Sequence, residues 1–158
     1  MTAANFDFLT ATDKPALLAL STPEWQELAK AALSELGYKV HMAATHGDFI
    51  TSFSQVAYQI VVIEECFAAD TAPENRSLNF LQSGQMQLRR HATIILVGDS
   101  YTSFNPLQAF QNGVHLVVNR SEMLLLIQFI QKVVADNDMF LHGYRETQRR
   151  IAHGLGKV

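Results

Sequence analysis

Two acidic side chains and a thiol stand together where a short apolar run ends. Glu64 and Glu65 follow the run QIVVI, and Cys66 comes next. Carboxylate oxygens are ligands that Mg²⁺ accepts, whereas two neighbouring acids disfavour the thiolate form that makes a cysteine nucleophilic. We therefore expect Cys66 to be a structural or incidental thiol, and any chemistry here to depend on the carboxylates.

Other chemical patterns are absent from the sequence. It contains no GxGxxG, no GxxxxGK[ST] and no GxSxG, so the nucleotide-binding fingerprints and the hydrolase nucleophile elbow are missing. No histidine stands at metal-ligand spacing from another histidine or cysteine. A polar loop at 98–103 follows an apolar run, a place where open α/β folds bind ligands. We expect no metal site, and we keep a small-molecule site in this loop region as an alternative.

Composition limits the class of protein. The chain has 158 residues, 48% hydrophobic and 17% charged, which is typical of one globular domain. Its single cysteine cannot form an internal disulfide, which fits a reducing compartment. The net charge of −3 argues against nucleic acid as the default partner, and no apolar run approaches the roughly 20 residues of a membrane span. With no signal peptide pattern at the start, we expect a cytoplasmic protein that contacts neither nucleic acid nor membrane.

Short apolar runs alternate with amphipathic stretches along the chain. Glycines after two helical stretches, at Gly37 and Gly113, mark helix ends, and Ser21 precedes an early proline as a helix cap. The residues at 67–74 are expected to form a loop. The predicted strands cover 16–20, 39–44, 59–63, 93–97 and 116–118, and the predicted helices cover 23–36, 48–56, 77–82, 105–112 and 122 to at least 135.

Unbroken apolar strands indicate burial on both faces of a sheet, which is typical of parallel strands joined by helices. Right-handed crossovers place such helices on both sides. The sequence therefore predicts an α/β, flavodoxin-like, doubly wound sheet of five parallel strands in the order 2-1-3-4-5. The predicted domain covers 15–135, after a polar segment at 1–14 and before a helical extension and tail at 136–158.

Four stretches carry a resemblance to a known family: STPEWQELAKAALSELGYKVHMA, YQIVVIEECF, TIILVGDS and QNGVHLVVNR. Over residues 14–135 the chain resembles the receiver domain of bacterial response regulators. The resemblance implies a domain that takes a phosphoryl group from a kinase histidine onto its own aspartate. That reaction uses an acid pair with Mg²⁺, the aspartate, a hydroxyl and a lysine, and an aromatic residue that reports the change.

The resemblance places other residue types at nearly all of these positions. The acid pair becomes Leu20 and Ser21, the aspartate becomes Glu64, the hydroxyl becomes Gly98, the lysine becomes Asn119, and the aromatic switch becomes Leu116.

These replacements remove the chemistry step by step. Leu20 and Ser21 offer Mg²⁺ no carboxylate, so charge on a transferred phosphoryl group is not neutralised. Glu64 carries its carboxyl about 1–1.5 Å further out than an aspartate would. We expect no phosphotransfer, no catalytic residue and no cofactor. Three interpretations of this position stay open: a surface glutamate, a mimic of the phosphorylated state, or a shift that brings Glu65 into the pocket.

The resulting hypothesis is a pseudo-receiver that acts by binding a protein in bacterial signalling. The alternative is a ligand-binding sensor that uses the crevice around Ser21, Glu64, Gly98 and Asn119. In the family the partner surface lies around helix four, strand five and helix five. The residues that the resemblance places on or near it are Phe104, Phe110, Arg120, Leu125 and Phe129.

The C-terminal tract extends the expected interaction surface. Phe140, Tyr144 and Ile151 recur at spacings of four and seven on a stretch that is otherwise polar. Such a stripe either folds back on its own domain or pairs with a second copy, and we expect a homodimer. Gly143 weakens a helix at this point by about 1 kcal/mol relative to alanine, so a break there is the rival interpretation.

Overall fold

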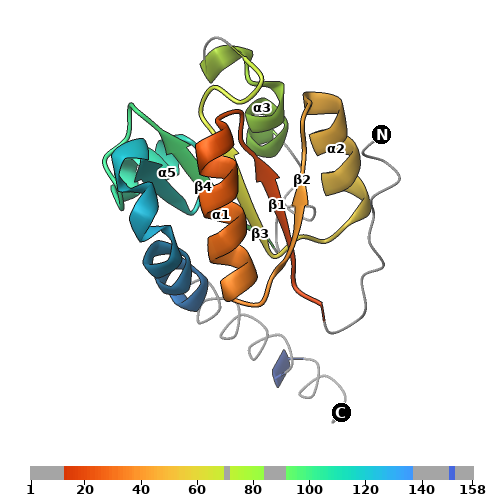
Figure 1. Ribbon diagram of the computed structural model, residues 1–158, viewed down its shortest axis with the longest axis vertical. Coiled ribbons are helices and arrows are strands. Elements are labelled where there is room, and N and C mark those ends of the chain that lie inside the picture. The colour runs from red at the N-terminus through yellow and green to blue at the C-terminus, as the bar shows by residue number, and fades with distance from the viewer. Residues whose placement is uncertain (1–12, 70–71, 84–91, 137–149, 152–158) are drawn as a thin grey trace.

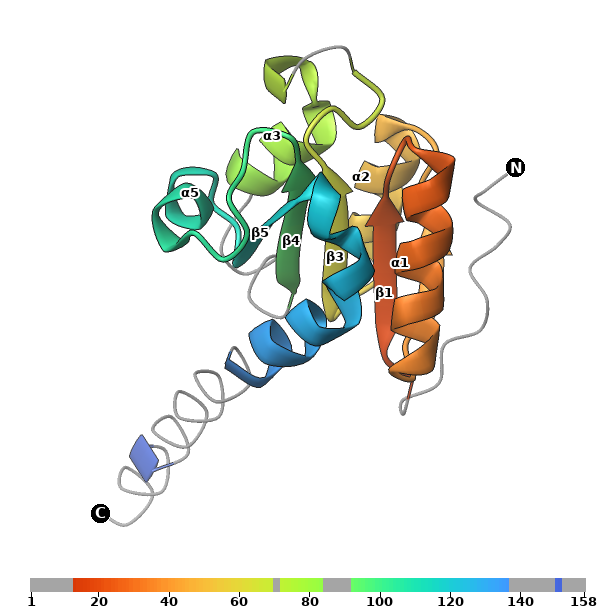
Figure 2. The same ribbon diagram turned by 60° about the vertical axis from the view of Figure 1, so that its left-hand side comes forward.

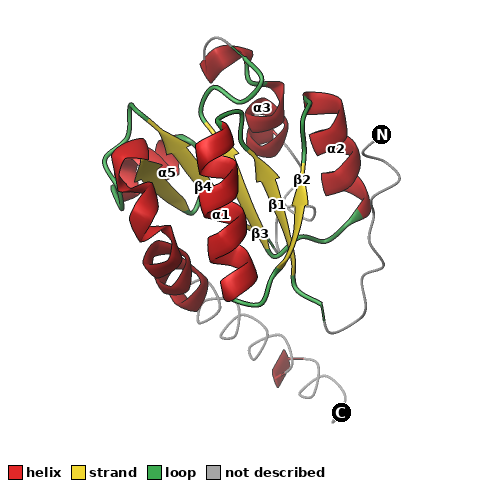
Figure 3. Cartoon of the chain, in the orientation of Figure 1, coloured by secondary structure: helices red, strands yellow, loops and turns green. Residues whose placement is uncertain are grey.

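The computed structural model describes residues 13–69, 72–83, 92–136 and 150–151. Its centre is a five-stranded, all-parallel sheet in the order β2-β1-β3-β4-β5, which confirms the predicted architecture. Figure 3 shows the strands in one layer with helices before and behind it. The strands are β1 (Pro15–Ala19), β2 (Lys39–Met42), β3 (Ile60–Glu64), β4 (Thr93–Gly98) and β5 (Leu116–Asn119).

Helices cover both faces of this sheet, as Figures 1 and 2 show. Two shorter 3₁₀ turns, η2 (Ala72–Glu74) and η3 (Arg120–Leu125), lie between the longer elements, and the chain is helical again over 126–136. The other α-helices of the described residues are α1 (Pro23–Glu35), α2 (His46–Gln55), α3 (Arg76–Ser83) and α5 (Pro106–Gln111).

Two apolar clusters, one on each face, hold these layers together. On one face the sheet packs against α2, α3 and α5, with Phe49 and Leu81 fully buried. On the other face it packs against α1 and the helix at 126–136, with Leu33 and Ile130 fully buried. Because β4 is buried along its whole length between these clusters, its sequence is an unbroken apolar run.

The register brings the carboxyl ends of the strands to one edge. Glu64 at the end of β3 lies beside Val97, and Gly98 at the end of β4 lies beside Asn119. The sequence positions of the expected pocket therefore meet in space. No helix within the described ranges is long and apolar enough to cross a membrane.

Several expected element ends are wrong. The cap residue of α1 is Thr22 and not Ser21, and its side chain makes no capping hydrogen bond. The last helix does not begin at Glu122, because a 3₁₀ turn with a kink at this residue occupies Arg120–Leu125 first. The expected loop at 67–74 contains the turn η2.

Candidate functional site

The Glu64 carboxylate is bound to the start of helix α1. Its Oε1 accepts hydrogen bonds from the backbone N–H groups of Ser21 (3.1 Å) and Thr22 (3.2 Å), and its Oε2 accepts one from the Thr22 hydroxyl (3.4 Å). The first N–H groups of a helix have no partner within the helix and favour a negative charge. A glutamate from β3 therefore replaces the missing side-chain cap, and Glu64 is a half-buried structural ligand instead of a free surface group.

Ser21 has a different partner from the one that a helix cap would have. Its Oγ accepts a hydrogen bond from the backbone N–H of Ala68 at 2.8 Å, in the loop that follows β3. The loops after β1 and β3 are thus joined twice, once through Glu64 and once through the Ser21 hydroxyl.

Glu65 occupies the space next to Gly98 where a hydroxyl side chain is expected in the family. A β-carbon placed on Gly98 would lie 2.8 Å from the Glu65 β-carbon and 3.0 Å from the Tyr101 ring, closer than such atoms normally approach. The Glu65 Oε1 accepts a hydrogen bond from the Ser100 hydroxyl at 3.0 Å. Burial and, after it, the Glu65 negative charge raise the pKa of Tyr101 above its usual range. Glycine at 98 is therefore the residue that lets Glu65 lie over the end of β4.

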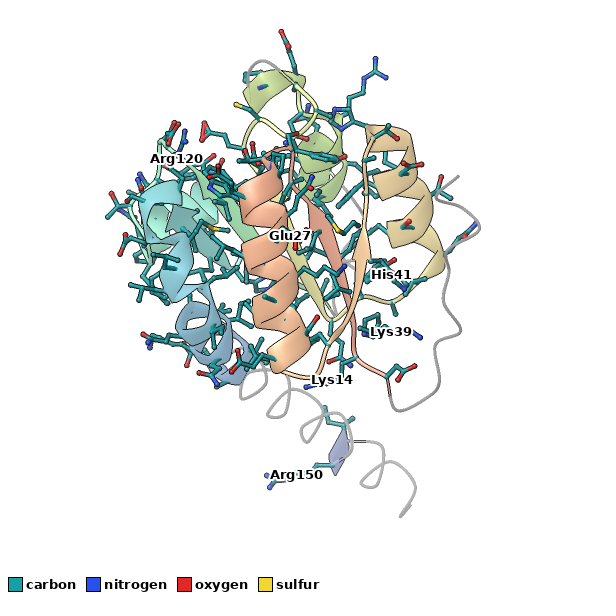
Figure 4. All side chains as sticks on the ribbon, viewed as in Figure 1. Lys14, Glu27, Lys39, His41, Arg120 and Arg150 are labelled. Carbon is teal, nitrogen blue, oxygen red and sulfur yellow. The ribbon has the colours of Figure 1, made fainter. Side chains whose placement is uncertain are left out.

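Asn119 and Arg120 hold the loop after β4 in place. The Asn119 Nδ2 donates to the Tyr101 carbonyl at 2.8 Å. The Arg120 guanidinium lies 2.9 Å from an Asp99 carboxylate oxygen and 4.9 Å from the centre of the Trp25 ring. Figure 4 shows Arg120 at the edge where the strands end. These side chains connect β5, the loop and α1, so Asn119, at the position where the resemblance implied a lysine, belongs to a structural network.

A magnesium ion does not fit the residues present. The acid-pair positions hold the buried, apolar Leu20 and the Ser21 hydroxyl, which is already bound to Ala68. The Glu64 oxygens accept three hydrogen bonds, and within the described ranges no three histidine, cysteine or acidic side chains gather as a metal site would need. The octahedral oxygen set that Mg²⁺ requires is therefore not provided.

The other expected site residues differ in exposure. Leu116 is buried in the cluster beneath α1, and Phe104 and Phe129 are half-buried, packed edge to face with ring centres 4.8 Å apart. Phe129, expected on or near the partner surface, turns toward Phe104 and packs against the same cluster. Phe110 is 83% exposed, and Leu125 is also exposed.

Part of this exposed surface was not predicted from the sequence. Leu107, three residues before Phe110 on α5, is 62% exposed, and Leu124 on η3 is exposed as well. The spacing of Leu107 and Phe110 in PLQAFQ could have indicated this apolar pair, because residues three apart share one face of a helix. Phe140 and Tyr144 lie outside the described residues.

Comparison with known proteins defines the class of fold. No family model matches the sequence, and neither does any curated protein. Solved structures do match: the chain has the fold of CheY-like response regulator receiver domains. At 14–18% identity to the three neighbours described next, the likeness establishes the fold and leaves the pocket chemistry to the residues themselves.

Particular neighbours make the comparison concrete. The chemotaxis response regulator CheY4 of Vibrio cholerae has a TM-score of 0.59 and 15% identity, over 77% of this chain and 99% of that one. The receiver domain of a sensor histidine kinase of Pseudomonas aeruginosa, with magnesium coordinated in its active-site cleft, has a TM-score of 0.60 and 18% identity, over 78% and 99%. An orphan response regulator of H. pylori has a TM-score of 0.58 and 14% identity, over 77% and 96%.

Proposed function

We propose that this chain is a pseudo-receiver, a non-enzymatic domain that binds a protein partner in signal transduction without being phosphorylated. One observation carries the proposal: the Glu64 carboxylate accepts hydrogen bonds from the backbone N–H groups of Ser21 and Thr22 and so caps α1. A carboxylate held in this way is not presented to a phosphodonor. The alternative of a ligand-binding crevice is not favoured, because Glu65 lies over the end of β4 and Asn119 is bound to the Tyr101 carbonyl.

The absence of phosphorylation is tested by mass spectrometry. The protein is incubated with a small acyl phosphate and Mg²⁺, beside a receiver domain that retains the acid pair, aspartate, hydroxyl and lysine. We expect the control to gain the mass of one phosphoryl group and this chain to gain none. A stable or hydroxylamine-sensitive adduct on Glu64 or Glu65 would contradict the proposal.

We further propose that the interaction surface includes the exposed face of α5 and that the partner is a second copy. Leu107 and Phe110 form an exposed apolar pair, and the stretch 100–119 contains no Asp, Glu, Lys or Arg. Two copies of an uncharged surface meet without the like-charge repulsion that opposes association of charged faces. Exposed apolar groups of this kind mark interaction sites when they are contiguous.

Light scattering over a range of protein concentrations tests this surface. Phe110→Ser and Leu107→Ser should lower the average mass at intermediate concentrations, whereas Gln111→Ser, an exposed polar change on the same helix, should not. A chain ending at 136 tests the predicted role of the tail. If that chain is monomeric while the Phe110 variant still associates, the tail and not α5 is the interface. If every version is monomeric, the partner is a different protein.

A further inference from the structure

The end of helix α5 contains the one Asn-Gly pair of the sequence, Asn112–Gly113. Asparagine is among the chemically labile residues of proteins. The backbone nitrogen of the residue that follows an asparagine can attack the side-chain amide, and glycine hinders this attack least because it has no side chain and its backbone rotates freely. The pair therefore has the residue types for a spontaneous modification that needs no enzyme.

The modification is a deamidation through a cyclic imide. As the Gly113 nitrogen bonds to the Asn112 Cγ, its hydrogen passes to the departing nitrogen, the bond between Cγ and Nδ2 breaks, and ammonia leaves. Water then opens the five-membered imide at either of its two carbonyl groups. The product is an aspartate or an isoaspartate. Both carry a negative charge, and the isoaspartate also adds one methylene group to the backbone.

The folded end of α5 prevents this attack. The ψ of Asn112 is 0°, which eclipses the Gly113 nitrogen with the Asn112 backbone nitrogen, whereas ring closure needs it eclipsed with the Asn112 β-carbon. The Gly113 N–H donates to the Phe110 carbonyl at 3.1 Å, and the Asn112 Nδ2 donates to the Gln108 carbonyl at 2.8 Å. Both reacting groups are therefore bound to the helix until its last turn opens.

Few contacts hold this last turn closed. Within α5, which the structure describes in full, only Ala109 is buried. On the side of α3, the Gln82 Nε2 donates to the Asn112 carbonyl at 3.0 Å, in an exposed hydrogen bond. The chain is fixed again at Val114, which is buried in the cluster on this face of the sheet. Because a segment with few buried apolar contacts opens at a smaller cost than the whole domain, the last turn of α5 can open by itself.

We propose that Asn112 is a site of spontaneous deamidation, gated by opening of the last turn of α5, and that the product weakens the proposed interaction surface. Asn112 lies in the stretch 100–119, which contains no Asp, Glu, Lys or Arg, two residues after the exposed Phe110. Deamidation brings a negative charge into this stretch, and two modified copies that meet there repel each other. The first part of the proposal stands on α5 alone, and the second rests on the proposed self-association.

Mass spectrometry of proteolytic peptides measures the modification itself. The whole protein is incubated at 37 °C and pH 8, either folded in buffer or unfolded in guanidinium chloride, and the mass gain from replacing the Asn112 amide by a carboxyl is followed over days. We expect the folded chain to react on the order of 10–100-fold more slowly than the unfolded chain, because only the last turn must open. The fully buried Asn75, which arginine follows, should stay unchanged in the folded chain.

Two matched glutamine variants test the gate. Gln82→Ala removes the hydrogen bond to the Asn112 carbonyl and should speed the folded-state reaction by about 2–5-fold. Gln128→Ala, exposed on the helix at 126–136, should leave the rate unchanged. Equal rates for the two variants would overturn the gate. So would a folded chain that reacts as fast as the unfolded one, or more than about 1,000-fold more slowly, which would mean that the site opens only when the whole domain unfolds.

Light scattering tests the effect of the new charge. Asn112→Asp reproduces one product, and Asn112→Ser lacks the same amide donor but carries no charge. We expect the Asp variant to associate on the order of tenfold more weakly than the Ser variant. If the two associate equally while Phe110→Ser abolishes association, the second part of the proposal is wrong. If the wild-type chain does not associate at all, the second part fails together with the proposed self-association, and the measured reaction rates still decide the first.

Discussion

One methylene group at position 64 decides what the carboxylate can reach. Glu64 lies at the end of β3, and its Oε1 meets two backbone N–H groups at 3.1 and 3.2 Å. An aspartate on the same backbone would withdraw its oxygens by about 1–1.5 Å, beyond hydrogen-bond distance. The extra methylene of Glu64 is therefore what lets its carboxylate complete the cap of α1.

Removing this cap should destabilise the domain. We expect Glu64→Ala to lower the free energy of unfolding by about 1–2 kcal/mol, the usual effect of losing a helix cap, and Glu64→Asp to lose much of the same amount. Glu27→Ala, on the exposed face of α1 that Figure 4 shows, should change it by about 0.5 kcal/mol at most. Urea denaturation measures all three. Equal stabilities for the Glu64 and Glu27 variants would show that the cap contributes nothing.

Gly98 provides a second test at the residue scale. We expect Gly98→Ala to lower the free energy of unfolding by about 1–3 kcal/mol, because the new β-carbon would collide with Glu65 and Tyr101. Gly47→Ala is the matched control: a β-carbon there meets only the Thr45 hydroxyl oxygen, at 3.8 Å, and should stabilise α2 by about 0.5–1 kcal/mol. Stabilisation by both changes would mean that Glu65 moves aside easily.

The sequence predicted which pocket positions meet, but not what their side chains do. Leu20 and Asn119 lie at the predicted edge of the sheet, because the carboxyl ends of parallel strands meet at one edge. The use of Glu64 as a helix cap could not be predicted, since it depends on which N–H groups across the β1–α1 loop lack a partner. The position of Glu65 over Gly98 likewise depends on side-chain geometry that no spacing encodes.

At the scale of elements, the loop after β4 closes the outer edge of β5. Phe104, in the left-handed region with a φ of +65°, donates its N–H to the Val117 carbonyl at 3.0 Å. The N–H of Asn119 donates to Ser103 Oγ at 2.8 Å. An open strand edge invites pairing with another chain. Because this edge already has partners, a docking protein would meet the side chains of α5 and not the backbone of β5.

The helix at 126–136 forms one wall of the core, and its contribution to the free energy of unfolding can be measured. Ile130 is fully buried against the sheet, so Ile130→Ala should lower the free energy of unfolding by about 2–5 kcal/mol. Gln128→Ala, exposed on the same helix, should be close to neutral. Thermal or urea unfolding compares the two. A small loss for the Ile130 variant would mean that this helix packs only loosely.

Elements were predictable where one physical signal dominated. Unbroken apolar runs identified the strands, and Gly37 and Gly113 do adopt positive φ values at the two helix ends where they were expected. The start of the last helix was not predictable, because the turn at 120–125 depends on a cap: the Asn119 side chain accepts the Ser121 N–H at 3.0 Å. Local propensity alone continues a helix through such a turn.

At the scale of the whole molecule, two buried tyrosines belong to one apolar cluster, on the face of the sheet that α2, α3 and α5 cover. Burial raises the pKa of Tyr58 to about 12, and burial with the Glu65 charge raises the pKa of Tyr101 further. The unfolded chain would ionise both near the ordinary value of about 10. Folding therefore favours the neutral phenols, and their contribution to stability is present in full below pH 10.

This stability should be lost as the pH rises. Between about pH 10 and 12 the unfolded state releases protons that folded Tyr58 and Tyr101 retain, so the free energy of unfolding must fall. Urea denaturation at pH 8, 10 and 11 measures the fall, and absorbance near 295 nm follows phenolate formation. Tyr58→Phe and Tyr101→Phe should each reduce the slope, since the substituted ring has no proton to release. A stability that stays level up to pH 11.5 would mean that both phenols ionise inside the folded domain at little cost.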